Sequence, residues 1–259
     1  MRSDIDLLVF SDLDGTLIDH DTYGWDAARP ALTALAEKGA GVILSSSKTA
    51  AEISVLRSDM ALTKWPAIVE NGAGVLTGAS SDAAPDQYVK IRQALDALTP
   101  AMRAQYTGFG DMTANEVATT TGLSVDAAHL AKKRAYSEPG LWSGDATGQQ
   151  EFESALQEYG ISAREGGRFL TLSFGRNKSD AMAEIIAQFA PRYTVALGDA
   201  PNDVEMLQAA DYGVIIANPH RAPLPILPTE ATGRILRTVG AGPLGWNSAI
   251  LDLLDRLEL

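Results

Sequence analysis

Near the start of the chain, continuous apolar runs that are typical of buried strands alternate with a stretch in which apolar residues recur at helical spacing. Short continuous apolar runs at 7–10, 42–44 and 67–69 predict three buried strands. Between the first two runs, apolar residues recur at helical spacing over 27–38, and Gly39 follows as a stop signal. Strands that alternate with helices in this way predict a parallel sheet with helices on both faces.

A different pattern interrupts this alternation in the middle of the chain. Residues 79–86 are small and polar and include a proline, which is typical of a linker. Residues 87–165 have mostly helical spacing of apolar positions, and residues 168–174 have strand character. We expect this middle part to fold as a separate unit.

The alternation of helix and strand then returns and continues along the chain. The expected elements are a helix at 179–189, a strand at 194–197, a short helix at 204–210, a strand at 214–216 and an amphipathic helix at 249–257. The simplest architecture is a discontinuous α/β core of residues 1–83 and 175–259, with a cap domain of residues 84–174 inserted into it.

Composition and charge exclude some classes of function. The 259 residues carry a net charge of −12, whereas nucleic-acid binders generally need a basic patch, so no nucleic-acid partner is expected. The chain has no cysteine, which excludes disulfides, thiolate metal sites and a cysteine nucleophile. No apolar run is long enough for a membrane span, and acids stand near the amino terminus where a signal peptide would need apolar residues. These features predict a cytoplasmic protein with no membrane partner.

Two carboxylates follow the first predicted strand directly, in the segment Asp12-Leu13-Asp14-Gly15-Thr16. In open α/β sheets, ligands bind beyond the carboxyl ends of the strands. One carboxylate there can attack phosphorus and form an aspartyl-phosphate, while the other protonates the leaving oxygen and later deprotonates water. The alternative is a surface Asp-Gly turn. Because four fixed positions coincide by chance in well under ~1% of such chains, the pattern favours catalysis.

Three more polar groups occur at later strand ends or helix starts. Ser46 follows the second strand and can donate to a phosphoryl oxygen, although a helix N-cap would explain it equally well. Lys178 stands at a helix start, where a bound anion would offset the unfavourable helix dipole, but a surface lysine is the alternative. Asp199, Asn202 and Asp203 follow another strand and can complete an oxygen-only magnesium site, or form an ordinary turn. Their joint occurrence in this order favours one phosphate-binding site.

Taken in order, these segments resemble the sequence motifs of a known enzyme family. The motifs Asp12-x-Asp14-Gly15-Thr16, Ser46, Lys178 and Gly198-Asp199-x-x-Asn202-Asp203 are similar to the four motifs of haloacid-dehalogenase (HAD) phosphatases. The inserted segment stands where that family carries its larger cap. The resemblance covers the whole chain and implies a HAD-like doubly wound parallel sheet core with an inserted α/β cap domain.

The resemblance also implies a role for each motif residue. Asp12 is expected to be the nucleophile and Asp14 the general acid and base. Lys178 and Ser46 are expected to hold and neutralise the phosphoryl group, with Asn202 supporting substrate binding. The implied cofactor is Mg²⁺, bound by the carboxylates of Asp12 and Asp199 and by the backbone carbonyl of Asp14.

More local segments resemble one branch of the family, the mannosyl-3-phosphoglycerate phosphatases. They are Asp19-His20-Asp21-Thr22-Tyr23-x-Trp25, Ser46-Ser47-Lys48-Thr49, Glu70-Asn71-Gly72-Ala73, Arg134-x-Tyr136-Ser137-Glu138-Pro139, Gly167-Arg168-Phe169-Leu170 and Asn218-Pro219. Ala135 departs from the pattern, which has an acid there. The resemblance implies a phosphorylated glycoside as substrate, hydrolysed to mannosylglycerate and phosphate. The resemblance then implies four further substrate-binding residues, Ser47, Arg134, Glu138 and Arg168. The two arginines suit the substrate carboxylate, because a guanidinium can bind a carboxylate bidentately.

Several alternatives stay open at this point. Another sugar-phosphate phosphatase, acting on glucosyl-3-phosphoglycerate or on a sucrose-phosphate-like substrate, would share these motifs, as would a phosphomutase. A helix-turn-helix regulator is the alternative from another class, because residues 116–124 resemble the middle of that motif.

The three histidines, His20, His129 and His220, are scattered along the sequence and lack metal-ligand spacing, so we expect no histidine metal centre. We place His129 on a cap helix surface. His20, close to the first motif in sequence, is a further candidate for substrate contact.

Overall fold

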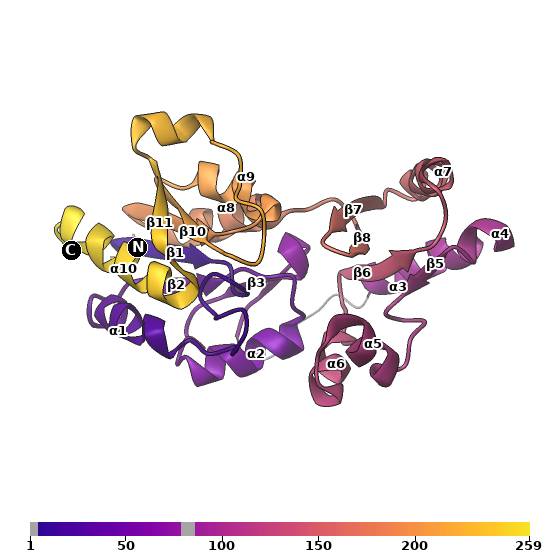
Figure 1. The fold of residues 1–259 in the computed structure, drawn as a ribbon, viewed down its shortest axis with the longest axis horizontal. Coiled ribbons are helices and arrows are strands. Elements are labelled where there is room, and N and C mark those ends of the chain that lie inside the picture. The colour runs from indigo at the N-terminus through magenta and orange to yellow at the C-terminus, as the bar shows by residue number, and fades with distance from the viewer. Residues whose placement is uncertain (1–4, 79–85) are drawn as a thin grey trace. The chain divides into compact units, whose positions relative to one another are not determined.

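A computed structural model describes residues 5–78 and 86–259 of the chain. These residues form two compact units, drawn in Figure 1: unit 1 comprises the described residues of Met1–Ser46, Lys64–Ile68 and Lys178–Leu259, and unit 2 comprises those of Ser47–Thr63 and Val69–Asn177. The predicted linker at 79–86 lies outside the described residues, apart from Asp86. The predicted division into core and cap places the first boundary later in the chain than these units do, and it stays a prediction.

Unit 1 contains a five-stranded sheet in the order β11-β10-β9-β1-β2. Its strands are β1 (Leu7–Ser11), β2 (Gly41–Leu44), β9 (Tyr193–Gly198), β10 (Tyr212–Ala217) and β11 (Ile235–Ala241). All four pairings are parallel, and Phe10 of β1 lies opposite Ile43 on one side and Ala196 on the other. The chain moves in one direction from β1 to β2 and in the opposite direction from β9 to β11. The sheet is therefore doubly wound, as expected, and its strand order reverses between β1 and β9.

Four helices of the described part of the chain accompany this sheet. They are α1 (Arg29–Glu37), α8 (Lys178–Phe189), α9 (Val204–Ala209) and α10 (Gly242–Arg256), with short 3₁₀ turns η1 (Asp26–Ala28), η3 (Pro201–Asp203) and η4 (Pro228–Thr232). Helix α1 packs against α10, and α8 packs against α9; in Figure 1 the two pairs lie on opposite faces of the sheet. Helices on both faces explain why every residue of β1 and β2 is buried.

Unit 2 contains an antiparallel four-stranded sheet in the order β5-β6-β8-β7. Its strands are β5 (Tyr106–Gly108), β6 (Ser137–Trp142), β7 (Ser162–Gly166) and β8 (Phe169–Ser173). The unit also holds α2 (Ala50–Asp59), η2 (Glu70–Gly72), β4 (Gly74–Leu76), α3 (Asp86–Ala97), α4 (Pro100–Arg103), α5 (Ala114–Thr121), α6 (Val125–Ala131) and α7 (Ala146–Gln157). Strand β3 (Ala67–Val69) pairs with β4.

Side chains that alternate along β8 contribute to two separate apolar clusters. Leu170 packs with residues of α3 and α7, whereas its neighbour Phe169 packs against buried residues of α5 and α6. Helices α5 and α6 therefore bury their apolar faces, Val117 and Ala128 among them, within unit 2. This packing accounts for the apolar positions of the helix-turn-helix-like pattern at 116–124 through burial within unit 2.

Two parts of the chain differ from the sequence-based expectation. The segment 87–165 contains strands β5, β6 and β7 as well as helices, and β6 was hidden because Pro139 and Gly140 are rare inside strands. Pro139 is tolerated because it lies one position beyond the last β5–β6 pair, Gly108 with Gly140. Strand β11 and the first half of α10 were also missed. Gly245 lowers the helix propensity of α10, so the sequence there does not indicate a helix. The fold requires glycine at this position, because a Cβ would lie 2.0 Å from the Gly240 carbonyl oxygen.

Within residues 5–78 and 86–259, no helix combines the length and the apolar character that a membrane crossing demands.

Candidate active site

Asp12 extends β1 by one residue at the point where the strand order reverses. Its backbone N–H donates to the Leu197 carbonyl at 2.9 Å, so the β1–β9 pairing continues through it. The Asp12 carbonyl accepts from the Ser11 hydroxyl at 2.7 Å, and that hydroxyl accepts from the Trp246 indole at 2.9 Å. Helix α10 therefore fixes the backbone that carries the Asp12 carboxylate.

Lys178 brings the first residue of α8 into contact with Asp12. Its buried ammonium lies 2.5 Å from Asp12 Oδ1 and 2.7 Å from Asp203 Oδ1. The other oxygen of Asp203 accepts from the backbone N–H groups of Asp199 at 3.2 Å and Ala200 at 3.0 Å. Asp203 thus holds both Lys178 and the turn after β9 in place, an arrangement in which each buried charge has a partner.

Asp199 presents a buried carboxylate from the end of β9. Its Oδ1 accepts from the Thr16 hydroxyl at 3.0 Å, and its Oδ2 accepts from the Asn218 amide at 2.8 Å. The Nε atom of Arg221 lies 3.3 Å from the same Oδ2. Two segments, one at Thr16 and one at 218–221, therefore orient this one side chain.

The donor set at this edge of the sheet fits a hard divalent cation. Carboxylate oxygens of Asp12, Asp199 and Asp203 lie within 4.8 Å of one another, and all three residues are buried. Asp12 and Asp203 contact the Lys178 ammonium, and Asp199 pairs with the Arg221 guanidinium, so three buried carboxylates share two cations and an excess of negative charge remains. Oxygen ligands with this excess charge are the environment that Mg²⁺ and similar cations prefer.

Burial sets the protonation behaviour of these groups. Burial, with the nearby charge of Asp203, raises the pKa of Asp12 to about 8, although Lys178 acts in the opposite direction. Burial also raises the pKa of Asp199. For Lys178, burial lowers the pKa, but the charges of Asp12 and Asp203 outweigh it and hold the pKa above its usual range. Lys178 therefore stays an ammonium, and a bound cation would return Asp12 to its charged, nucleophilic form.

The raised pKa of Asp12 predicts that cation binding stabilises the protein more at higher pH. An acid whose pKa is raised on folding stabilises the fold fully below its ordinary value of 3.8, and this contribution is lost as the pH rises toward about 8. A divalent cation beside the carboxylate removes that loss. Thermal unfolding with and without Mg²⁺ should therefore give a larger increase in Tm near pH 8 than near pH 5. An equal increase at both pH values would contradict this assignment.

The other predicted residues of unit 1 lie on the same strand ends or turns. Asp14 lies in a turn with Gly15, whose φ of +81° and lack of a Cβ are both required, because a Cβ would lie 2.3 Å from the Asn218 amide nitrogen. Ser46 is buried just after β2, the strand next to β1. Asn202 is exposed in the 3₁₀ turn that also carries Asp203. Their roles in catalysis and binding stay predictions.

The predicted substrate-binding residues of unit 2 are not all brought together. The Arg134 guanidinium donates to the Ser47 carbonyl at 3.2 Å and to the Ser137 hydroxyl at 2.6 Å. Glu138 is buried and pairs instead with Arg92 at 2.7 Å. The exposed Arg168 donates to the Thr120 carbonyl at 2.5 Å. Ser47 and Arg134 therefore form one group, while Glu138 and Arg168 have other partners.

Glu70 organises the Arg134 segment, a role that sequence reasoning did not assign. Its buried carboxylate accepts from the backbone N–H groups of Ala135 at 2.9 Å and Tyr136 at 3.1 Å, and from both the N–H and the hydroxyl of Ser137 at 2.8 and 2.7 Å. It also lies 3.2 Å from the Arg134 guanidinium. Glu70 has a φ of +51°, an unusual backbone conformation for a non-glycine residue. Glu70 directly follows β3, and this position at a strand end is the sequence signal that could have indicated its role.

Asn218 and Arg221 were also missed as partners of Asp199. Asn218 follows β10 directly, so the principle that ligands bind beyond the carboxyl ends of the strands would have indicated it. Arg221 has no such signal, because it lies further along the loop that follows.

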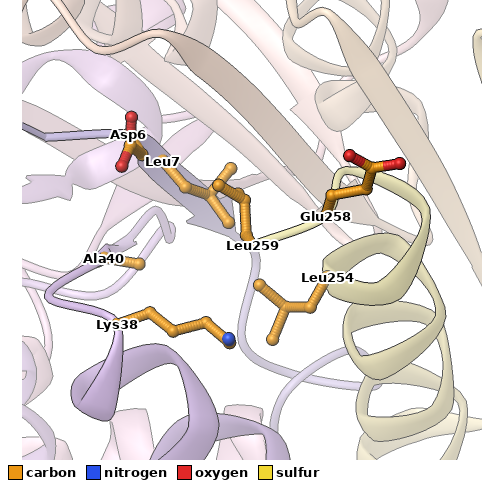
Figure 2. A pocket seen from close by; sticks show the side chains of 7 residues that line it. All are labelled: Asp6, Leu7, Lys38, Ala40, Leu254, Glu258 and Leu259. Carbon is orange, nitrogen blue, oxygen red and sulfur yellow. The ribbon is translucent and has the colours of Figure 1, made fainter.

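The hollow shown in Figure 2 is separate from this site. It has a volume of about 280 Å³ and lies at the start of β1, whereas Asp12 follows the end of that strand. Its lining residues are Asp6, Leu7, Lys38, Ala40, Leu254, Glu258 and Leu259. None of the residues predicted for catalysis or binding is among them.

Comparisons with known proteins identify the family. The model for haloacid dehalogenase-like hydrolases matches residues 9–102 and 143–224. The glucosyl-3-phosphoglycerate/mannosyl-3-phosphoglycerate phosphatase of Methanococcoides burtonii is 34% identical over 96% of this chain and 97% of its own length. The chain therefore belongs to the haloacid dehalogenase-like hydrolase family. This confirms the resemblance found in the sequence, and the expected enzyme class, a phosphatase, agrees with both comparisons.

Solved structures share the fold. The sucrose-phosphatase of Synechocystis sp. PCC6803 has a TM-score of 0.61 at 16% identity, with 98% of both chains covered. The HAD subclass IIB sugar phosphatase BT4131 has a TM-score of 0.62 at 18% identity, with 97% of this chain and 98% of the other covered. The expected fold class, a HAD-like α/β core with an inserted cap, is confirmed.

Proposed function

We propose that this chain hydrolyses a phosphomonoester through an aspartyl-phosphate formed on Asp12, with Mg²⁺ as cofactor. The observation that carries this proposal is the buried group at the carboxyl end of β1, where Lys178 contacts Asp12 and the Asp199 carboxylate lies close by. Phosphoryl transfer depends on positioning and on neutralising charge at phosphorus, and this group supplies a nucleophile, a fixed ammonium and cation ligands.

The reaction divides into two displacements at phosphorus. In the first, an Asp12 oxygen bonds to phosphorus while the bond to the leaving oxygen breaks, and Asp14 gives that oxygen a proton. In the second, Asp14 takes a proton from water, the water oxygen bonds to phosphorus, and the bond to Asp12 breaks. Lys178 and Ser46 hold the phosphoryl oxygens throughout. The carboxylates of Asp12 and Asp199 and the carbonyl of Asp14 would hold Mg²⁺, which would supply charge neutralisation.

Removal of the metal should stop turnover. EDTA followed by gel filtration should abolish phosphate release, and added Mg²⁺ should restore it, because the excess negative charge around Asp12 would otherwise repel the phosphate group. Ca²⁺ should inhibit, since its larger and looser coordination shell does not hold the reacting groups in line. Phosphate release is measured with a colorimetric assay. Undiminished activity in metal-free buffer after chelation would refute the metal requirement.

The proposed substrate is mannosyl-3-phosphoglycerate, with the glucosyl analogue as the closest alternative. This assignment is supported by the 34% identical relative, whose name includes both compounds, and by the sequence segments around Arg134 and Arg168. The substrate carries a carboxylate and a hexose in addition to its phosphate, so it needs cationic and polar groups beyond those around Asp12. Arg134, Arg168, Glu138 and Ser47 are the residues proposed to supply them. The reaction is proposed to take place in the cytoplasm, with no nucleic-acid or membrane partner.

Arg168→Ala should reduce kcat/KM for mannosyl-3-phosphoglycerate far more than for p-nitrophenyl phosphate, which has no carboxylate. The expected loss is roughly 30-fold or more, because an unpaired buried carboxylate costs about 2 kcal/mol or more. Arg164→Ala is a matched control, since Arg164 is an exposed arginine on β7 of the same sheet. Equal losses on both substrates would reject the carboxylate role.

Arg134→Ala is expected to show the same selectivity together with a loss of stability. Its side chain is only 6% exposed and its guanidinium pairs with the fully buried Glu70 carboxylate, so truncation leaves that charge with fewer partners. A side-by-side assay with plain sugar monophosphates tests the substrate class itself. If one of these outperforms the glyceryl glycosides, only the general phosphatase assignment remains.

A further inference from the structure

Two of the three histidines of the chain, which are 200 positions apart in sequence, lie side by side in unit 1. The rings of His20 and His220 stack with centroids 4.2 Å apart and an angle of 22° between their planes. A carboxylate oxygen of Asp21 lies 3.4 Å from Nε2 of His220. Nitrogen or oxygen atoms of all three side chains lie within 4.8 Å of one another. The spacing of the histidines in the sequence did not indicate this pairing, which the fold produces.

Local hydrogen bonds fix the backbone on both sides of this group. The Asp19 carboxylate accepts from the N–H groups of Asp21 at 3.2 Å and Thr22 at 2.9 Å, and from the Thr22 hydroxyl at 2.8 Å. On the other side, the N–H of His220 donates to the Asn218 side-chain oxygen at 2.9 Å. The two loops therefore present their side chains from defined positions, while the side chains of His220 and Asp21 are 39% and 71% exposed. An ion from solution can reach them without opening the fold.

We propose that His20, Asp21 and His220 form a second cation site, which binds a borderline transition-metal ion such as Zn²⁺. Two imidazoles and one carboxylate are a common zinc ligand set, and water can complete a tetrahedral shell on the exposed side. Magnesium prefers oxygen ligands, so the two sites differ in selectivity: the carboxylates around Asp12 take the hard ion and the histidine pair takes the softer one. The acidic chain, with a net charge of −12, further attracts cations.

The position of this site links it to the candidate active site. Asn218 holds the His220 backbone through its oxygen and holds Asp199 Oδ2 through its nitrogen, at 2.9 and 2.8 Å. Arg221, the residue after His220, lies 3.3 Å from the same Asp199 oxygen. A metal ion bound by the histidine pair would therefore tie the segment that orients Asp199 to the loop that follows the Asp12 motif.

Imidazole NMR of the intact, ¹⁵N-histidine-labelled protein tests the proposal directly. With Mg²⁺ in excess, one equivalent of Zn²⁺ should shift the ring nitrogen signals of His20 and His220 and leave His129 unchanged. His129 lies exposed on α6 of unit 2, as expected from the sequence, and serves as the internal control. If none of the three signals moves, or if all three respond alike, the site does not exist.

Chelator competition with Zn²⁺ provides the second measurement. Wild type and His129→Gln should each take up one equivalent with the same affinity, and Asp199→Asn should keep this event because the ion does not bind at the carboxylates. His20→Gln and His220→Gln should each weaken it by about tenfold or more, the effect of losing a metal-binding partner. Circular dichroism confirms that each variant is folded, which is expected because both side chains are on exposed loops. Unchanged zinc affinity in both folded variants would overturn the proposal.

Discussion

Asp12→Asn should abolish turnover while the protein remains folded. The amide keeps the shape of the side chain but cannot displace a leaving group from phosphorus, so both half-reactions are lost. Removal of a catalytic nucleophile reduces kcat by roughly 10⁴-fold or more in well-studied hydrolases. The measurement is phosphate release from p-nitrophenyl phosphate and from mannosyl-3-phosphoglycerate. Circular dichroism and thermal unfolding establish that the variant is folded.

A matched control separates the nucleophile from general effects of removing an acid. Asp26→Asn changes an exposed aspartate of unit 1, whose side chain is 83% exposed, and should leave kcat within about twofold of wild type. The Asp12→Asn preparation has to be free of wild-type enzyme, which mass spectrometry can establish. Appreciable turnover by such a homogeneous preparation would rule out covalent catalysis by Asp12.

Lys178→Met should be strongly destabilising as well as inactive. Lys178 is 1% exposed and its ammonium is the group between the Asp12 and Asp203 carboxylates. Its removal leaves both carboxylates buried without their cation, which costs about 3–5 kcal/mol in comparable ion clusters. Urea unfolding should report this loss in the free energy of unfolding. Lys38→Met, a change at an exposed lysine of the same unit, should cost less than about 0.5 kcal/mol.

A double-mutant cycle sharpens this prediction. Because Asp12→Asn removes one of the two charges that Lys178 neutralises, the double variant should be more stable than the sum of the single losses implies. Simple additivity would show that the two side chains do not interact in the folded state. A Lys178→Met protein with wild-type stability would show that the ammonium is not buried between the carboxylates.

The group of polar side chains at the carboxyl edge of the sheet could be predicted because its signals are local. Asp12, Ser46 and Asp199 each follow a short apolar run, and the carboxyl ends of parallel strands converge at one edge. The positions of the strands in the sequence therefore predict which side chains meet at this edge. Lys178 stood out at the start of α8 because a bound anion would offset the unfavourable helix dipole there, with a surface lysine as the alternative. The structure shows that Lys178 is buried against Asp12 and Asp203.

Other features depend on partners that are distant in sequence. Strand β6 contains Pro139 and Gly140 and exists because β5 and β8 flank it, so its own sequence argues against a strand. Glu70 organises a segment more than sixty positions later, through backbone N–H groups that carry no sequence signature. The pairing of His20 with His220 requires two loops to be placed next to each other, which only the three-dimensional fold determines.

Trapping of the phosphorylated enzyme tests the central claim most directly. Asp14→Asn should still be phosphorylated by p-nitrophenyl phosphate, because nitrophenolate leaves without a proton, but should not activate water for the second step. After acid quenching, peptide mass spectrometry should locate the phosphoryl group on Asp12, with about one equivalent of nitrophenolate released per enzyme in the initial burst. A phosphoryl group on another side chain, or sustained turnover with no phosphorylated peptide, would contradict the account.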